Sequence, residues 1–235
     1  DESQRIRPVR LDRSTPADAA VIAGFEDADP ATPAGYKNLI ALNDTYNGKM
    51  TIEVIAAVDG ADKATRVLRL TADQSPFQNT AGGSLVTASG TFYLRGQNFA
   101  WVTLNGGPVL SGAKPDGGLV DLVLDFTNQT ADINLRTGVE AGSDVRTEVV
   151  GTGLPFNIVT GAYGGGITVS VWDPNSALIH AIDGSLRGNV GGSPTYAAGT
   201  HGMTTSGLYT ATGTDQGVSV TVDGVYFGTD PNALP

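Results

Sequence analysis

The stretch Gly118 to Leu135, GLVDLVLDFTNQTADINL, decides how the rest of the chain is interpreted. Apolar residues alternate with polar ones on both sides of the polar tetrapeptide Thr127 to Thr130, and this pattern predicts a β-hairpin with one buried face. A single hairpin is not stable in water, so other strands must cover that face. The side chains expected to point inward are Leu122, Leu124, Phe126, Ile133 and Leu135.

The composition favours strands and turns along most of the chain. Of the 235 residues, 40% are hydrophobic, which is enough for a sizeable core in one large all-β domain or two small ones. The 32 glycines are about twice the average usage. Because glycine enters positive φ without a steric penalty, this excess indicates many tight turns and bulges between the strands.

Charge and cysteine content exclude several classes of function. A formal net charge of −10 argues against a nucleic-acid partner and against docking to anionic lipid, and acidity of this size is most simply explained as a means of staying soluble. The absence of cysteine excludes disulfides, thiolate metal sites and a cysteine nucleophile. No apolar run reaches the roughly 18 residues of a transmembrane helix. The start Asp1-Glu2-Ser3, without Met, favours a chain whose signal peptide has been removed.

Residues 1–35 are predicted to form an N-terminal arm. Its start is basic, an acidic stretch rich in Ala and Pro follows at 24–33, and residues 14–23 carry the signals of one short helix. The arm either docks on a negative surface, its own or that of a neighbouring subunit, or is a loosely packed end. In the first case the subunit contacts are Arg5, Arg7, Arg10 and Arg13.

The remaining chain divides into two predicted parts. Residues 36–80 have the pattern of a β-meander of about three strands, with Asn47-Gly48 as a turn. A polar stretch at 73–83 marks the internal boundary. Residues 84–235 contain short strands at regular spacing, which predicts an antiparallel barrel or sandwich. The triplet Gly164 to Gly166 is interpreted as a turn between two of these strands.

Short motifs give the second part a family resemblance. The sequence Asp125-Phe126 followed by Thr127 to Thr130 resembles the DF-x-N-x-T hairpin of bacterial transferrin-binding-protein-like β-barrel domains, the eight-stranded surface barrels of transferrin-binding lipoproteins, factor-H-binding lipoproteins and haemophores. Residues 89–94 with 99–104 look like the opening hairpin of that family, 182–188 like its GxxxGN strand, and 224–228 like its closing GxFYG strand.

The resemblance covers roughly residues 84–230 and implies an antiparallel eight-stranded β-barrel behind the arm and the meander, in an all-β chain. It also implies an exported protein on the outer-membrane surface, in the periplasm or secreted, that binds a protein or a haem-like ligand. Two features depart from the family: the lipidated Cys of those lipoproteins is missing, and residues 229–235 replace the usual acidic, glycine-containing tail.

No motif in the sequence predicts catalysis. There is no nucleophile elbow, Walker loop or HExxH pattern. Asp121, Asp125 and Asp132 surround one hairpin, where alternation assigns them to the solvated face rather than to a carboxylate pair. His180 shares a strand face with apolar residues and is predicted to be a satisfied, barrel-lining histidine. No metal site is predicted.

Residues in glycine-rich segments are the candidate ligand contacts. Tyr163 and Tyr196 are expected in exposed loops, and His201 lies in such a loop beside Met203, where the pair is a candidate for binding haem or a transition metal. The sequence thus favours a non-enzymatic binding module. The alternative is a structural subunit of a filament, lattice or envelope complex, a homo-oligomer whose N-terminal arm makes the subunit contacts.

Overall fold

The structure is a computed structural model that describes residues 36–44, 50–58, 64–74, 77–81, 84–85, 90–112, 118–138, 143–194 and 202–230. The predicted arm at 1–35, with its four arginines and its short helix, lies outside these residues. The chain divides into two compact units, Asp1–Asp73 and Gln74–Pro235. No helix in the described part of the chain is long and apolar enough to span a membrane.

The first unit contains a three-stranded sheet in the order β1-β2-β3. Strand β1 pairs antiparallel with β2, and its register shifts once between Asn38 and Ile40. The strands lie where the sequence predicts a meander; the predicted domain boundaries at 80 and 84 stay a prediction. The bounds are β1 Tyr36–Asp44, β2 Met50–Val58 and β3 Ala64–Gln74.

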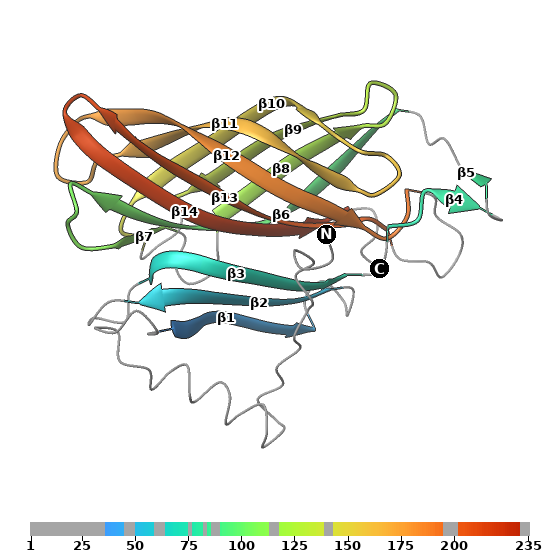
Figure 1. Ribbon diagram of the computed structural model, residues 1–235, viewed down its shortest axis with the longest axis horizontal. Coiled ribbons are helices and arrows are strands. Elements are labelled where there is room, and N and C mark those ends of the chain that lie inside the picture. Colours follow the sequence, from blue (N-terminus) through green and yellow to red (C-terminus); the bar gives the residue numbers. More distant parts are fainter. Residues whose placement is uncertain are drawn as a thin grey trace, which may run out of the picture. The chain divides into compact units, whose positions relative to one another are not determined.

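The second unit is an antiparallel β-barrel of eight strands, as the sequence predicts (Figure 1). Its sheet runs in the order β14-β13-β12-β11-β10-β9-β8-β6, and β14 pairs back with β6 to close it. The short β7 adds to β6 over three pairs, and β4 and β5 pair with each other. The bounds are β4 Thr80–Ala81, β5 Ser84–Leu85, β6 Thr91–Leu104, β7 Leu110–Gly112, β8 Gly118–Asp125, β9 Thr130–Thr137, β10 Arg146–Pro155, β11 Ala162–Trp172, β12 Ile179–Gly191, β13 Thr204–Asp215 and β14 Val218–Thr229.

The hairpin predicted from residues 118–135 is β8 with β9. Its pairing is unbroken from Leu119↔Arg136 to Asp125↔Thr130. The five side chains predicted to point inward are each at most 2% exposed, so that prediction is confirmed. Asp121, Asp125 and Asp132 lie on the outer face, also as predicted, and Asp121 forms ion pairs with Arg95 and Arg136. The hairpin therefore separates core and solvent along its whole length.

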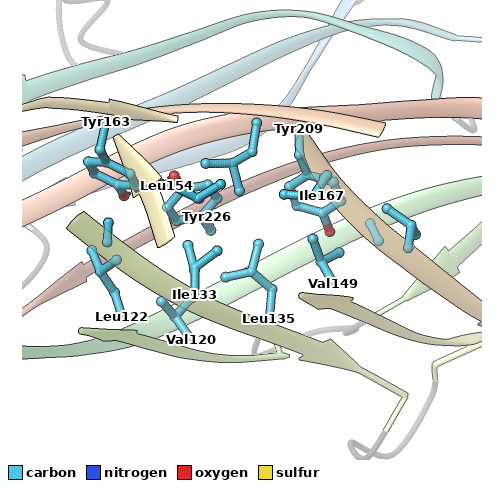
Figure 2. Close-up of a cluster of buried hydrophobic side chains, with 14 of the residues drawn as sticks. Val120, Leu122, Ile133, Leu135, Val149, Leu154, Tyr163, Ile167, Tyr209 and Tyr226 are labelled. Carbon is cyan, nitrogen blue, oxygen red and sulfur yellow. Dashed lines mark hydrogen bonds between the residues drawn. The ribbon is translucent and has the colours of Figure 1, made fainter. Parts of the chain in front are cut away.

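Three tyrosines fill the barrel interior together with the aliphatic core (Figure 2). The Tyr226 hydroxyl donates to that of Tyr163 at 2.9 Å, and Tyr209 donates to Asn98 Oδ1 at 2.9 Å. A Cβ atom at Gly188 would lie 2.3 Å from the Tyr226 oxygen, so only glycine leaves room for that ring. Burial raises the pKa of all three phenols above their usual value.

One end of the barrel contains a cluster of phenylalanines. The Phe126 and Phe156 rings meet edge to face at 5.0 Å between centroids, and Phe77 packs beside both at 6.3 and 6.4 Å. Asn79, two residues after Phe77, donates from Nδ2 to the Ile158 carbonyl at 2.9 Å. The segment that precedes the barrel thus holds the loop between β10 and β11 in place.

Candidate binding groove

The barrel wall is irregular where β10 meets β11, and we call this irregular stretch the seam. Their pairing runs from Arg146↔Trp172 to Val150↔Thr168 and resumes only at the single bridge Phe156↔Tyr163. Over the interrupted stretch β10 stays paired with β9 through a bulge between Gly151 and Leu154. Strand β11 meanwhile pairs with β12 without a break. Each side of the seam is therefore anchored to its own neighbour.

The seam is packed from within. A Cβ atom at Gly165 would lie 3.3 Å from Leu154 Cδ2 and 3.8 Å from Pro155 Cδ. Leu154 is buried, whereas Pro155 is exposed. The seam is thus a depression in the outer surface rather than a hole into the barrel.

An open groove of about 880 Å³ lies at this end of the seam. Its lining comes from the turn between β8 and β9, the end of β10 with the loop that follows, and the facing parts of β11 and β12. The lining residues are Gln129 and residues 155–159, 162–165 and 185–187.

The floor of the groove is β11, and its outer face there carries almost no side chains. Gly164 pairs with Arg187, and Gly166 pairs with Ser185. A Cβ atom at Gly166, just beyond the lining residues, would meet no other atom within 4 Å, whereas one at the lining residue Gly164 would lie 2.3 Å from the Leu186 carbonyl oxygen. The interpretation of this glycine triplet as a turn is therefore wrong. It lies inside a strand whose backbone is open to an approaching ligand.

The two walls of the groove differ in chemistry. On the β12 side, the exposed Arg187 is the one charged residue among those that line the groove. On the loop side, Val159 is 58% exposed. The Asn157 side chain fixes this loop, because its Oδ1 accepts the backbone N–H groups of Val159 and Thr160 at 2.9 and 3.0 Å. The groove is preformed, with one apolar wall and one cationic wall.

Of the candidate ligand contacts predicted from the sequence, Tyr163 is among the residues that line the groove, although it is almost fully buried. The expected position of Tyr163 in a loop is wrong: it is on β11, 4% exposed, and its hydroxyl shares a hydrogen bond with Thr205 Oγ1 at 2.6 Å. Met203 is fully buried in the core cluster. Tyr196 and His201 lie outside the described residues. The role of all four in binding stays a prediction.

Sequence reasoning did not select Arg187 as a functional residue. A signal for it was present in Gly184 to Gly188, GSLRG, because alternation in a strand with Leu186 inside puts Ser185 and Arg187 outside. The glycine that faces Arg187 belongs to another strand, so their pairing follows only from the fold.

His180 is buried inside the barrel, as predicted, but it is not satisfied. Neither ring nitrogen has a hydrogen-bond partner. The nearest carboxylate oxygens are Asp173 Oδ2, 3.8 Å from Nε2, and Asp215 Oδ2, 3.9 Å from Nδ1. Backbone N–H donors lower the pKa of both aspartates, Asn175 at Asp173 and Ala181 at Asp215.

These two carboxylates approach opposite edges of the His180 ring, so one ion cannot be bound by all three residues. No group of three or more His, Asp or Glu residues with the geometry of a metal site occurs within the described ranges.

No family model matches the sequence, and no curated protein matches it. Two solved structures are similar in fold. Transferrin binding protein B, isotype 1, of Neisseria meningitidis serogroup B is 11% identical, with a TM-score of 0.47, over 77% of this chain and 32% of that one. HpuA of Kingella denitrificans, solved in complex with human haemoglobin, is 12% identical, with a TM-score of 0.42, over 81% of this chain and 57% of that one.

The chain thus spans about a third of the first protein and somewhat more than half of the second. The eight-stranded antiparallel barrel that the resemblance implies is present in the structure.

Proposed function

We propose that the protein is an exported, non-enzymatic binding module that holds a protein partner in the groove at the seam. The observation that supports this most directly is the open, preformed groove of about 880 Å³ with an exposed apolar wall. Its loop wall is fixed by the Asn157 and Asn79 hydrogen bonds, so little ordering free energy is lost when a partner binds.

The shape of the groove favours a protein over a small molecule. Pockets for small ligands usually bury about 70–90% of the ligand surface. This groove is open, as a protein surface with a central apolar contact and a polar rim would be. Val159 and Arg187 supply these two elements, and arginine is among the residues that contribute most to protein interfaces.

A haem-like ligand is the finer alternative, and it rests on two residues. His180 and Met203 are buried outside the groove lining, and the hydroxyl of the lining residue Tyr163 is already hydrogen-bonded to Thr205 and Tyr226, so none of them presents a free iron ligand to the groove. Haem binding would therefore depend on His201 and Tyr196. Visible spectra of the full chain and of His201→Ala after addition of haem test this. The absence of a ligand-bound Soret band in the unmodified chain would contradict haem binding.

Affinity capture from the surface fraction of the native organism tests the binding function. The bait is the full chain, compared with Val159→Asp in the groove and with Val150→Asp, a matched change at a 41% exposed valine of β10 outside the groove lining. We expect one partner to be retained by the unmodified chain and by Val150→Asp and to be lost with Val159→Asp. Equal retention by all three baits would contradict a role for the groove.

Assembly through the N-terminal arm is the second candidate. It is favoured by four of the fourteen Lys and Arg residues, Arg5, Arg7, Arg10 and Arg13, which lie within the first thirteen positions of an acidic protein. Mass photometry of the full chain and of a chain without residues 1–35 separates the two functions. Oligomers that depend on the arm support assembly, and a monomer that is unaffected by the truncation contradicts it.

A further inference from the structure

Among the described residues, Arg187 is the one arginine of the barrel strands without a partner, and it lies in the groove. Arg95 and Arg136 pair with Asp121, and the Arg146 guanidinium lies 4.1 Å from the centre of the Trp172 ring. Arg187 has no ion pair or ring contact among the described residues. An exposed guanidinium is a planar set of donors suited to two-point pairing with a carboxylate.

The surroundings of Arg187 keep it available. Its neighbours across the sheet are Gly164 and Leu208, neither of which is acidic. The nearest outward carboxylate on its own strand is Asp183, four residues away, or about 13 Å along a strand. That distance exceeds the Debye length of about 8 Å in physiological salt. The groove is therefore locally cationic on a protein of net charge −10.

The floor suits an extended backbone. Gly164 lines the floor and Gly166 follows at the next outward position, and neither carries a side chain, so another chain can approach this face of β11 closely. The walls stand on opposite sides of this floor, because β11 lies between β10 and β12 in the sheet. Successive side chains of an extended segment point in opposite directions, so one can reach Arg187 while the next reaches Val159.

We infer that the groove binds an extended protein segment in which an acidic residue, paired with Arg187, is adjacent to an apolar residue packed against Val159. This inference rests on the proposed function and adds the chemistry of the occupant. The rest of the acidic surface repels such a segment, so Arg187 also determines where it docks.

The test uses phage-displayed linear peptides of about 12 residues, long enough to lie along the whole floor. They are selected on the full chain and then synthesised for titration. We expect enrichment of Asp or Glu next to an apolar residue. Arg187→Ala should weaken binding about tenfold or more, because it removes a charge-assisted pair. Arg95→Ala, an equal change of charge three strands away around the barrel, should leave the Kd unchanged.

Two further variants make the test specific. Arg187→Glu should bind a peptide whose acidic residue is replaced by Lys, which restores an opposite pair. Gly166→Leu changes the outward position next to the lining residues, where a Cβ atom has no other atom within 4 Å, and should obstruct the end of the floor, whereas Thr168→Leu at the next outward position of β11 should not. Circular dichroism verifies that each variant is folded.

The failures of the two proposals are distinguishable. Peptides that bind through Val159 but do not respond to Arg187→Ala would overturn the acidic-segment inference and leave the groove as a binding site. A library from which no peptide is retained by the full chain above the level of Val159→Asp would overturn the extended-segment inference. Affinity capture with the same variant would still decide whether a folded partner uses the groove.

Discussion

Two hairpins of the barrel use the same period-two pattern with different results. In β8–β9 the pairing is unbroken, and every second side chain is buried. In β10–β11 the pairing stops at Val150↔Thr168, β10 bulges, and glycines replace outward side chains. Both hairpins contribute side chains to the core, but only the irregular one also lines an open groove. A closed barrel can thus carry a binding surface on its wall as long as both edges of the irregularity stay paired to their outer neighbours.

Shortening one side chain in each hairpin should give the largest difference in stability between the two. Leu124→Ala removes a fully buried side chain of β8 and should lower the free energy of unfolding by about 2–5 kcal/mol. Val159→Ala in the loop of the groove should change it by less than about 0.5 kcal/mol. Urea unfolding of both variants gives the comparison. A loss at Val159 as large as that at Leu124 would show that the groove loop is part of the core.

Alkaline pH should destabilise the barrel through the three buried tyrosines of its interior. Because burial raises the pKa of Tyr163, Tyr209 and Tyr226 in the folded state, their contribution to stability is complete below the unfolded pKa of about 10 and is lost as the pH rises toward their folded pKa. Each tyrosine should lower the free energy of unfolding by about 1.4 kcal/mol per pH unit in this range, and the three together by about 4 kcal/mol per pH unit. Urea unfolding at pH values on both sides of 10 measures the slope, and Tyr226→Phe should reduce it by about a third. An unchanged slope in that variant would contradict the assignment.

A glycine of the interior and one on the outer face of β11, beside the groove, should respond in opposite ways to a methyl group. Gly188→Ala places Cβ against the Tyr163 and Tyr226 rings and should cost about 1–3 kcal/mol. Gly166→Ala meets open space and should raise stability by about 0.5 kcal/mol, because glycine weakens a strand through its unfolded-state entropy. Thermal unfolding of the pair gives the sign of each change. Equal destabilisation would show that the outer face of β11 at Gly166 is as tightly packed as the interior.

A smaller effect is expected at His180, which lies in the regularly paired part of β11–β12. His180→Leu replaces a buried ring that has no hydrogen-bond partner with an apolar side chain and should raise stability by about 1 kcal/mol. Denaturant midpoints near neutral pH test this. A loss of stability would show instead that Asp173 and Asp215 hold the ring across 3.8 and 3.9 Å.

The sequence predicted the parts of the fold that depend on local pattern. Alternation from Gly118 to Leu135 was sufficient to identify the hairpin and its inward side chains. The same alternation, with apolar residues two positions before and after His180, placed that side chain inside. The seam could not be predicted this way. Whether a glycine triplet turns the chain or extends through a strand depends on the strands beside it, and the turn interpretation moved Tyr163 from the core into a loop.

The candidate site was also hard to predict from the sequence, because it too depends on which strands lie side by side. Arg187 becomes distinctive only because Gly164 pairs with it from another strand and because the other arginines of the barrel strands have partners. No local motif contains either fact. The absence of a hydrogen-bond partner at His180 is likewise a property of packing, not of sequence spacing.

The pairing of β14 with β6 also determines how the barrel can form. It joins residues 95–104 to residues 220–229, so the barrel can close on its first long strand only after the last one has been synthesised. Until β14 arrives, the sheet has two unpaired edges, and open edges of this kind invite pairing with other chains. The other long strands pair with their neighbours in sequence, so this single closing contact is the one with the largest sequence separation, and contacts of large sequence separation form slowly. The time between synthesis of β6 and closure by β14 is therefore the interval in which this chain is most exposed to aggregation.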